Sequence, residues 1–166
     1  VVDFATQAFE KGYRVAVIST GGALIDFAQR NNLPYIQLPQ TDIQPRSALG
    51  YSVLALIKMI GDEDLFEEIR SAGVEVESEK FAKGGMQLAQ KLKGKLPIIY
   101  SSRKNLPLAY IWKIIFNETA KIPAFYNAFP ELNHNEMTGF DAIPQTKNLS
   151  EDMHFIFLST DSDWPR

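Results

Sequence analysis

The most restrictive feature of this sequence is a regular alternation of short apolar runs with longer segments of helical periodicity. The run from Tyr13 to Ser19 is β-branched and lies between Gly12 and the pair Gly21-Gly22, which is typical of a buried parallel strand. Similar runs occupy residues 33–38, 96–100, 123–129 and 154–159, and helical patterns occupy residues 3–12, 22–31, 46–61, 79–93 and 107–119. Successive parallel strands need helical crossovers, which cover a sheet on both faces. The sequence therefore predicts an α/β fold of doubly wound parallel sheets with flanking helices.

The strands are predicted to fall into two sheets. The segment 62–78 is acidic and is interrupted by Gly73, so we interpret it as a connector that holds at most a short helix. The strands at 13–19 and 33–38 precede it and are expected to form one sheet, and the three later strands are expected to form another. A chain of 166 residues is long enough for one complete core or for parts of two domains.

Composition and charge exclude several kinds of partner. The net charge of −3 gives no broad basic surface, so neither nucleic acid nor an anionic membrane is expected as a partner. No apolar run approaches the roughly 18 residues of a membrane span. Cysteine is absent, which excludes disulfides and thiolate chemistry and agrees with a cytoplasmic protein. The only two histidines do not form an i, i+4 pair, so no metal site is expected.

Polar or glycine-rich residues follow the predicted strands, at the edge where parallel sheets bind ligands. Thr20-Gly21-Gly22 comes directly after the first strand, and its backbone N–H groups could hold a phosphate or could simply form a tight turn. Ser101-Ser102 could cap the next helix or contact a ligand. Arg46 follows a proline at the start of an apolar helix, where a positive charge opposes the helix dipole. Arg46 is therefore a candidate substrate contact, and an ordinary surface arginine is the alternative.

Glu118 and His134 are the candidate acid–base residues. His134 lies in the segment P-E-L-N-H-N-E, and neutral imidazole is the side chain best suited to proton transfer near pH 7. Glu118 lies upstream in N-E-T-A-K-I-P-A-F, before a proline-bounded strand. A carboxylate and an imidazole could supply a base and an acid to one pocket. His154 opens an apolar strand and is interpreted as structural.

Several segments resemble one known family. The runs Asn117–Phe125 and Pro130–Glu136 closely resemble the bifunctional phosphoglucose/phosphomannose isomerases, which are built from sugar-isomerase (SIS) domains. Further similarity lies in Gln44–Tyr51, in Ser19–Leu24 and in the closing Asp163-Trp164-Pro165-Arg166. The resemblance covers nearly the whole chain in the right order, and the segments around His134 and Arg46 are its most specific parts.

The resemblance implies two flavodoxin-like SIS halves, the first only partly present. Residues 1–45 would be the C-terminal part of the first SIS domain, 46–78 a linking helix with the acidic connector, and 79–166 the second SIS domain without its C-terminal helix. The chain begins Val1-Val2-Asp3, without an initiator methionine or signal peptide, which also suggests a start within a longer protein. The family's phosphate-binding loop and catalytic lysine would lie outside the chain, so this segment alone is expected to be inactive.

The resemblance also implies an activity and roles for three residues. The family interconverts glucose 6-phosphate, and mannose 6-phosphate, with fructose 6-phosphate through a cis-enediolate, without metal or organic cofactor. Glu118 matches its catalytic base, His134 its ring-opening histidine, and Arg46 the arginine thought to stabilise the enediolate. The family works as a homodimer in which each subunit supplies its histidine to the partner's site. The substrate would be a sugar phosphate.

The chain departs from the family pattern at two positions, and two other functions remain as alternatives. Ile111 stands where an arginine is expected, and Thr119 stands where an asparagine is expected. One alternative is a non-catalytic SIS module that binds or senses a phosphosugar, although a sensor has no need of both Glu118 and His134. The other is an SIS enzyme acting on a different sugar. The sequence does not decide between glucose and mannose preference.

Overall fold

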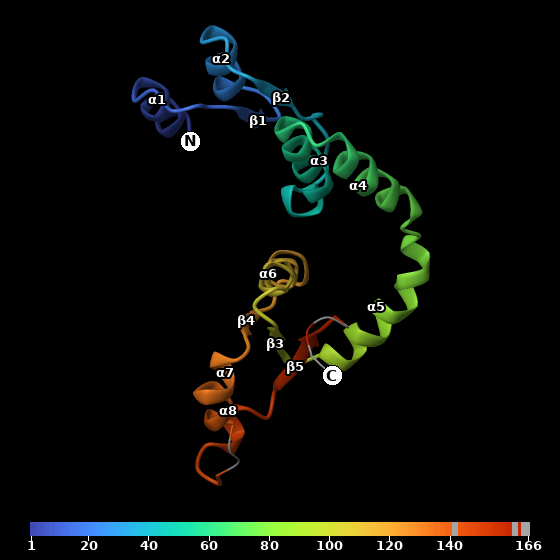
Figure 1. Ribbon diagram of the computed structural model, residues 1–166. Helices are drawn as coiled ribbons and strands as arrows, with labels where there is room; N and C mark the ends of the chain where they lie inside the picture. Colours follow the sequence, from blue (N-terminus) through green and yellow to red (C-terminus); the bar gives the residue numbers. More distant parts are fainter. Residues whose placement is uncertain (141–142, 161–162, 164–166) are drawn as a thin grey trace. The chain divides into compact units, whose positions relative to one another are not determined.

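The computed structural model of the protein describes residues 1–140, 143–160 and 163, and it divides into two compact units, Val1–Glu77 and Ser78–Arg166 (Figure 1). The first unit contains a two-stranded parallel sheet and the second a three-stranded parallel sheet. The predicted distribution of strands, two in one sheet and three in another, is therefore confirmed. The α/β fold of parallel sheets with flanking helices is confirmed as well.

The first unit is built on one βαβ crossover. The elements are α1 (Val2–Glu10), β1 (Val17–Ser19), α2 (Ala23–Arg30), β2 (Tyr35–Gln37), a 3₁₀ turn η1 (Pro45–Ser47), α3 (Leu49–Ile60) and α4 (Glu63–Glu75). Val17 of β1 pairs with Tyr35 of β2. Val17, Ile25 and Ala28 form the buried core between the sheet and α2. The first strand is shorter than predicted, because only Val17–Ser19 has a partner strand.

The predicted connector 62–78 is mostly a helix. Gly61 ends α3 in the left-handed conformation, with φ 85°, and Asp62 then begins α4 by accepting a 3.0 Å hydrogen bond from the backbone N–H of Leu65. Glu63 and Asp64 in the first turn suit the positive end of the helix dipole. Gly73 lies inside α4, near its end, where a glycine costs only about 1 kcal/mol. Gly73 therefore does not interrupt the helix, contrary to the expectation from the sequence.

The second unit has a sheet of order β4-β3-β5. Its elements are α5 (Ser78–Leu92), β3 (Leu96–Ser101), α6 (Leu106–Ile115), a π-helical turn η2 (Phe116–Ala120), β4 (Phe125–Ala128), α7 (Glu131–His134), α8 (Glu136–Gly139), a 3₁₀ turn η3 (Lys147–Leu149) and β5 (Met153–Leu158). The central strand β3 pairs in parallel with both neighbours, so that Ser101 lies between Ala128 and Leu158. The sequence patterns do not predict α7, α8 or η3.

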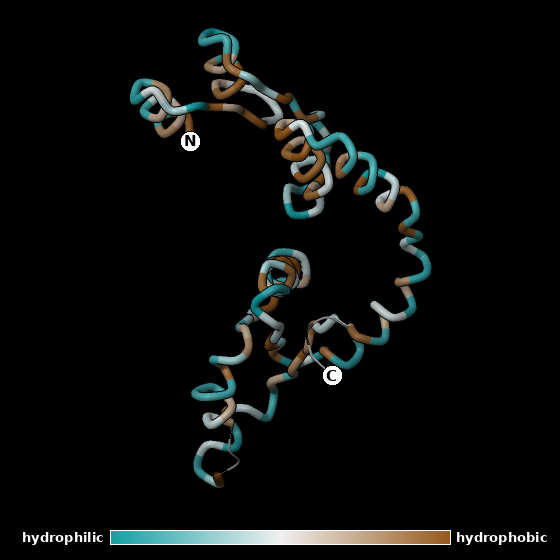
Figure 2. The backbone as a smooth tube through the Cα atoms, in the orientation of Figure 1, coloured by the Kyte–Doolittle hydropathy of each residue, from teal (hydrophilic) through white to brown (hydrophobic). Residues whose placement is uncertain are grey.

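Both faces of this sheet are buried, by different helices. Ile98 and Tyr100 of β3 pack with Leu132 of α7, and the neighbouring aromatic rings of Phe129, Phe140 and Phe155 enlarge this cluster. Ile99 points to the other face and packs against Ala109 of α6. Figure 2 shows the apolar character of β3, β5 and α6. The doubly wound arrangement is thus formed by α6 on one face and by α7 and α8 on the other.

Two classes of feature are missing from the residues that the structure describes. None of the helices in these residues is long and apolar enough to cross a membrane. The same residues contain no cluster of three histidine, cysteine, aspartate or glutamate side chains that could hold a metal ion.

Leu132 is expected to hold α7 against the sheet, because its side chain is fully buried among apolar groups. Leu132→Ala should lower the free energy of unfolding by about 2–5 kcal/mol, through lost burial and the cavity that remains. Leu149→Ala is the matched control, since Leu149 is 69% exposed and should cost less than about 0.5 kcal/mol. Urea unfolding followed by circular dichroism measures both values. Equal losses for the two variants would contradict this account of the core.

Candidate functional site

Glu118 lies on a single π-helical turn that continues α6. The backbone N–H of Lys121 bonds the carbonyl oxygen of Phe116, five residues back, and Lys121 then leaves the helix with φ 57°. Asn117 fixes the turn by donating a 2.9 Å hydrogen bond from Nδ2 to the carbonyl oxygen of Ile122. Phe116 packs into the core beneath α6, whereas Glu118 is exposed. The predicted helix 107–119 therefore changes to π geometry at Phe116, and such turns occur frequently at functional sites.

His134 is the last residue of the short helix α7. Leu132, two residues earlier, is buried on the sheet, and the exposed His134 is part of the surface of the same helix. The hydroxyl of Thr138 donates a 3.3 Å hydrogen bond to the carbonyl oxygen of His134, which joins α7 to α8. The sequence expectation of a polar segment after a strand is correct, but the segment is helical.

The structure does not bring Glu118 and His134 of one chain together. The turn with Glu118 continues α6, which covers one face of the sheet, while α7 covers the other face. The two residues also lie at opposite ends of β4, because Glu118 precedes its first residue and His134 follows its last. Figure 1 shows the strands between α6 on one side and α7 and α8 on the other. The two side chains of a single chain therefore lie on segments that pack against opposite faces of the sheet.

The carboxylate of Glu136, in α8, contacts two strands of the sheet. The hydroxyl of Tyr100 on β3 donates a 2.8 Å hydrogen bond to Oε2 of Glu136, and Nδ2 of Asn127 on β4 donates to Oε1. Burial, the hydrogen bond to Glu136 and the charge of its carboxylate together raise the pKa of Tyr100 well above its usual value. Tyr100 therefore stays protonated and acts as a donor. Nothing in the strand pattern marks Tyr100 as more than a core residue, so its contact with Glu136 could not be predicted from the sequence.

The carboxyl ends of β3 and β5 are joined through Asp163. Its carboxylate accepts hydrogen bonds from the Ser102 hydroxyl at 2.5 Å and from Asn105 Nδ2 at 2.7 Å, and it also accepts from the backbone N–H of Thr160 at 2.5 Å. These bonds, led by that from Ser102, lower the pKa of Asp163. The Ser102 oxygen also accepts a 3.3 Å bond from the Asn105 N–H, at the start of α6. Ser102 thus stabilises the turn before α6, whose N-cap residue is Asn105 and has no side-chain cap hydrogen bond.

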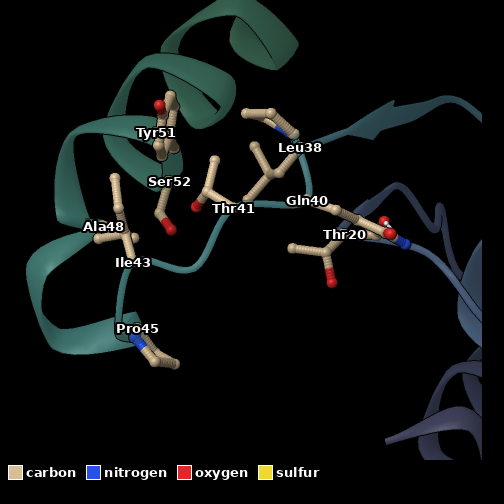
Figure 3. Close-up of a pocket in the computed structure, with 10 residues that line it drawn as sticks. Thr20, Leu38, Gln40, Thr41, Ile43, Pro45, Ala48, Tyr51 and Ser52 are labelled. Atoms are coloured by element: carbon tan, nitrogen blue, oxygen red, sulfur yellow. Dashed lines mark hydrogen bonds between the residues drawn. The ribbon is translucent and has the colours of Figure 1, made fainter.

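The first unit has a hollow of about 290 Å³ beyond the carboxyl ends of its two strands (Figure 3). Its lining comes from the end of β1, from the loop after β2 and from the start of α3: Thr20, Leu38, Pro39, Gln40, Thr41, Ile43, Pro45, Ala48, Tyr51 and Ser52. Hydroxyl and amide groups therefore alternate with apolar walls, which is the composition of a small-molecule site. Arg46 is half-buried in the turn η1, directly after the lining residue Pro45.

The glycine pair after β1 is explained by close packing of its turn. The side-chain amides of Gln37 and Gln40 both donate to the carbonyl oxygen of Thr20, at 3.2 and 3.4 Å. A Cβ atom on Gly21 would lie 3.3 Å from Nε2 of Gln40, and Gly22 has φ 71°. The contacts of this turn therefore match the tight-turn alternative of the sequence analysis.

Comparison with known proteins identifies the family. Residues 81–166, more than half of the chain, match the family described as the bacterial phospho-glucose isomerase C-terminal SIS domain. The chain belongs to this family. The resemblance stated from the sequence is thereby confirmed, and the matched SIS domain contains Glu118, His134, the Tyr100–Glu136 contact and Asp163.

Individual relatives extend the similarity beyond the SIS domain. The chain is 35% identical over 162 residues to the bifunctional phosphoglucose/phosphomannose isomerase of Caldicellulosiruptor bescii, covering 87% of this chain and 47% of the relative. The enzyme of the same name from Thermoplasma acidophilum is 34% identical over 163 residues, covering 95% and 48%. The D-glucosamine-6-phosphate 4-epimerase of Sulfolobus acidocaldarius is 31% identical over 140 residues, covering 79% and 44%. The chain thus spans about half the length of the curated relatives it matches. No solved structure gave a significant match.

The pKa of Tyr100 predicts a specific alkaline destabilisation of the SIS domain. A raised pKa in the folded state gives stability that is complete below the ordinary tyrosine pKa of about 10 and is lost as the pH rises toward the folded value. The difference in free energy of unfolding between the unmodified protein and Tyr100→Phe should therefore be constant from pH 8 to about 10 and fall above it. Urea unfolding of both proteins across this range measures the difference. A difference that stays constant to about pH 11 would contradict the Tyr100–Glu136 interaction.

Proposed function

We propose that the full-length protein is an aldose–ketose isomerase that interconverts glucose 6-phosphate, and also mannose 6-phosphate, with fructose 6-phosphate. Membership of the phospho-glucose isomerase SIS family supports isomerase activity on a sugar phosphate. The observation that carries the finer proposal is the position of Glu118 and His134. Both lie within the matched domain, on short helical segments held to the sheet by apolar neighbours, the partly buried Phe116 and the fully buried Leu132. The proposed setting is a cytoplasmic homodimer.

The proposed chemistry assigns one step to each residue. His134 protonates the ring oxygen of the closed sugar while the C1 hydroxyl gives up its proton to water, so that the C1–O5 bond breaks and the ring opens to the free aldehyde. The Glu118 carboxylate removes the proton from C2, which gives a cis-enediolate, and returns that proton to C1. A second proton passes from O2 to O1, so the aldose becomes the ketose with no net gain or loss of atoms. A carboxylate in this role contributes about 10²–10⁴-fold to the rate.

Arg46 is proposed to stabilise the negative charge of the enediolate. A guanidinium group keeps its charge at any pH that the enzyme meets, and its planar donors suit two neighbouring oxygens. The position of Arg46 beside a hollow with hydroxyl and amide groups agrees with a sugar contact. The hydroxyl side chains of Thr41 and Ser52 line this hollow and are suited to sugar hydroxyl groups.

The separation of Glu118 and His134 by the sheet supports a site shared between two subunits. Each chain would supply Glu118 to one site and His134 to the other site of a twofold dimer, since twofold symmetry makes both exchanges equivalent. In this arrangement a single chain has no need to bring the two residues together.

A second candidate is an epimerase that acts at another carbon of a sugar phosphate. The observation in its favour is the relative named D-glucosamine-6-phosphate 4-epimerase. The two activities differ in the proton that moves. An aldose–ketose isomerase exchanges the C2 proton with solvent, whereas inversion at C4 leaves C2 untouched. The exchange experiment described next therefore separates them.

Glu118→Gln in the full-length protein should reduce exchange of the C2 proton of glucose 6-phosphate by about 10²–10⁴-fold, because the amide keeps the shape of the carboxylate and loses its basicity. Proton NMR in deuterated water measures the exchange, and isothermal titration measures substrate binding, which should change little. Glu151→Gln is the control, as Glu151 is an exposed carboxylate of the same unit. Exchange at the unmodified rate in Glu118→Gln would reject Glu118 as the base. Absence of exchange in the unmodified enzyme would reject the isomerase.

Mixed dimers should show whether the two residues act across the subunit boundary. His134→Ala and Glu118→Gln are each expected to inactivate the full-length enzyme. When the two variant proteins are denatured and refolded together, each heterodimer has one site with both residues intact, so isomerase activity should reappear. Native mass spectrometry establishes that heterodimers have formed. If heterodimers form and the activity stays at background, both residues act within one subunit.

A further inference from the structure

Glu136 lies two residues after His134 and is bound to two different strands. Oε2 accepts the 2.8 Å hydrogen bond from the Tyr100 hydroxyl of β3, and Oε1 accepts from Nδ2 of Asn127 on β4. Asn127 is itself held in place, because its Oδ1 accepts a 2.8 Å bond from the backbone N–H of Ala128. The carboxylate of Glu136 therefore joins the segment that carries His134 to the central strand and to an edge strand.

This contact is one of two that fix His134 on the sheet. Leu132 is fully buried two residues before His134, and Glu136 is bound two residues after it. The helices α7 and α8 have four residues each, which is far too short for a helix to be stable without tertiary contacts. The direction of the His134 side chain therefore depends on the apolar contact on one side and on the polar contact on the other.

The hydrogen bonds require an acceptor at both oxygens of residue 136. The Tyr100 hydroxyl and the Asn127 amide nitrogen are both arranged as donors, and an ionised carboxylate accepts at each of its oxygens. Hydrogen bonds to an ionised acceptor are stronger than those between neutral groups. Covering the sheet does not by itself require two hydrogen bonds to a carboxylate, because apolar side chains already bury the same face.

We propose that Glu136 is a positioning residue for ring opening, which holds the α7 and α8 segment so that the imidazole of His134 reaches the ring oxygen of the sugar. This inference rests on the proposed role of His134. A displacement of about 1 Å in a catalytic group can cost about 10²-fold in rate. Loss of Glu136 therefore acts on the ring-opening step through His134 and leaves proton transfer by Glu118, on the other face of the sheet, without a direct effect.

The test measures ring opening separately from isomerisation. In the full-length Glu118→Gln enzyme, isomerisation is blocked and the exchange between the α and β anomers of glucose 6-phosphate reports ring opening alone. Exchange spectroscopy by NMR gives its rate. Adding Glu136→Ala should slow the catalysed exchange by about 10- to 100-fold. Adding Glu131→Ala should change it by less than about twofold, because Glu131 is exposed in the same segment and its bond, from Nδ2 of Asn135, stays within that segment.

A double variant separates positioning from a general structural effect. If Glu136 acts only through His134, then His134→Ala with Glu136→Ala should exchange anomers no more slowly than His134→Ala alone. A further loss in the double variant, or an unchanged rate in Glu136→Ala, would overturn the inference. If Glu136→Ala fails to fold, Tyr100→Phe keeps the buried ring and removes one donor, and a slower anomer exchange is again expected. An unchanged rate in Tyr100→Phe would then overturn the inference.

The result for His134 distinguishes the two proposals. If His134→Ala leaves anomer exchange unchanged, the proposed function of His134 fails and the role of Glu136 fails with it. If His134→Ala slows the exchange and Glu136→Ala does not, only the positioning role of Glu136 is rejected.

Discussion

The burial of the central strand β3 on both faces is the constraint on which the second unit depends. From Pro97 to Ser101 every residue is buried, and strands pair with it on both sides. A strand of this kind needs apolar cover above and below, which α6 provides through Ala109 and α7 provides through Leu132. The two candidate acid–base residues lie on these two covers. The packing of the core therefore places Glu118 and His134 on segments that cover opposite faces of the sheet.

An apolar contact and a polar contact together hold each candidate residue, on both faces of the sheet. On the α6 face, the π turn holds Glu118 through the partly buried ring of Phe116 and through the bond from Asn117 to the Ile122 carbonyl. On the other face, two helices of one turn each would not persist alone, and they depend on Leu132 and on the bonds from Tyr100 and Asn127 to Glu136. Each candidate catalytic residue thus lies on a short segment whose geometry comes from its neighbours.

Local patterns were sufficient for most of the architecture. Short apolar runs predicted the five strands found in the described residues, since a strand buried in a parallel sheet requires continuous apolar residues, and the acidic segment 62–78 predicted their division between two sheets. Local patterns did not predict the helices α4, α7 and α8. The helix α4 was taken for a connector because of its acidic residues and Gly73. The helices α7 and α8 carry too few residues for any periodicity to be visible.

The sequence by itself determined the fold class, the family and the candidate residues Arg46, Glu118 and His134, because residue types and their spacing within short segments are properties of the chain alone. Only the tertiary structure decided how these residues are arranged. The sheet separates Glu118 from His134, and Glu136 acquires its partners Tyr100 and Asn127 from strands that precede it by 36 and 9 residues. Such contacts arise when distant segments pack on one sheet, and no local pattern encodes them.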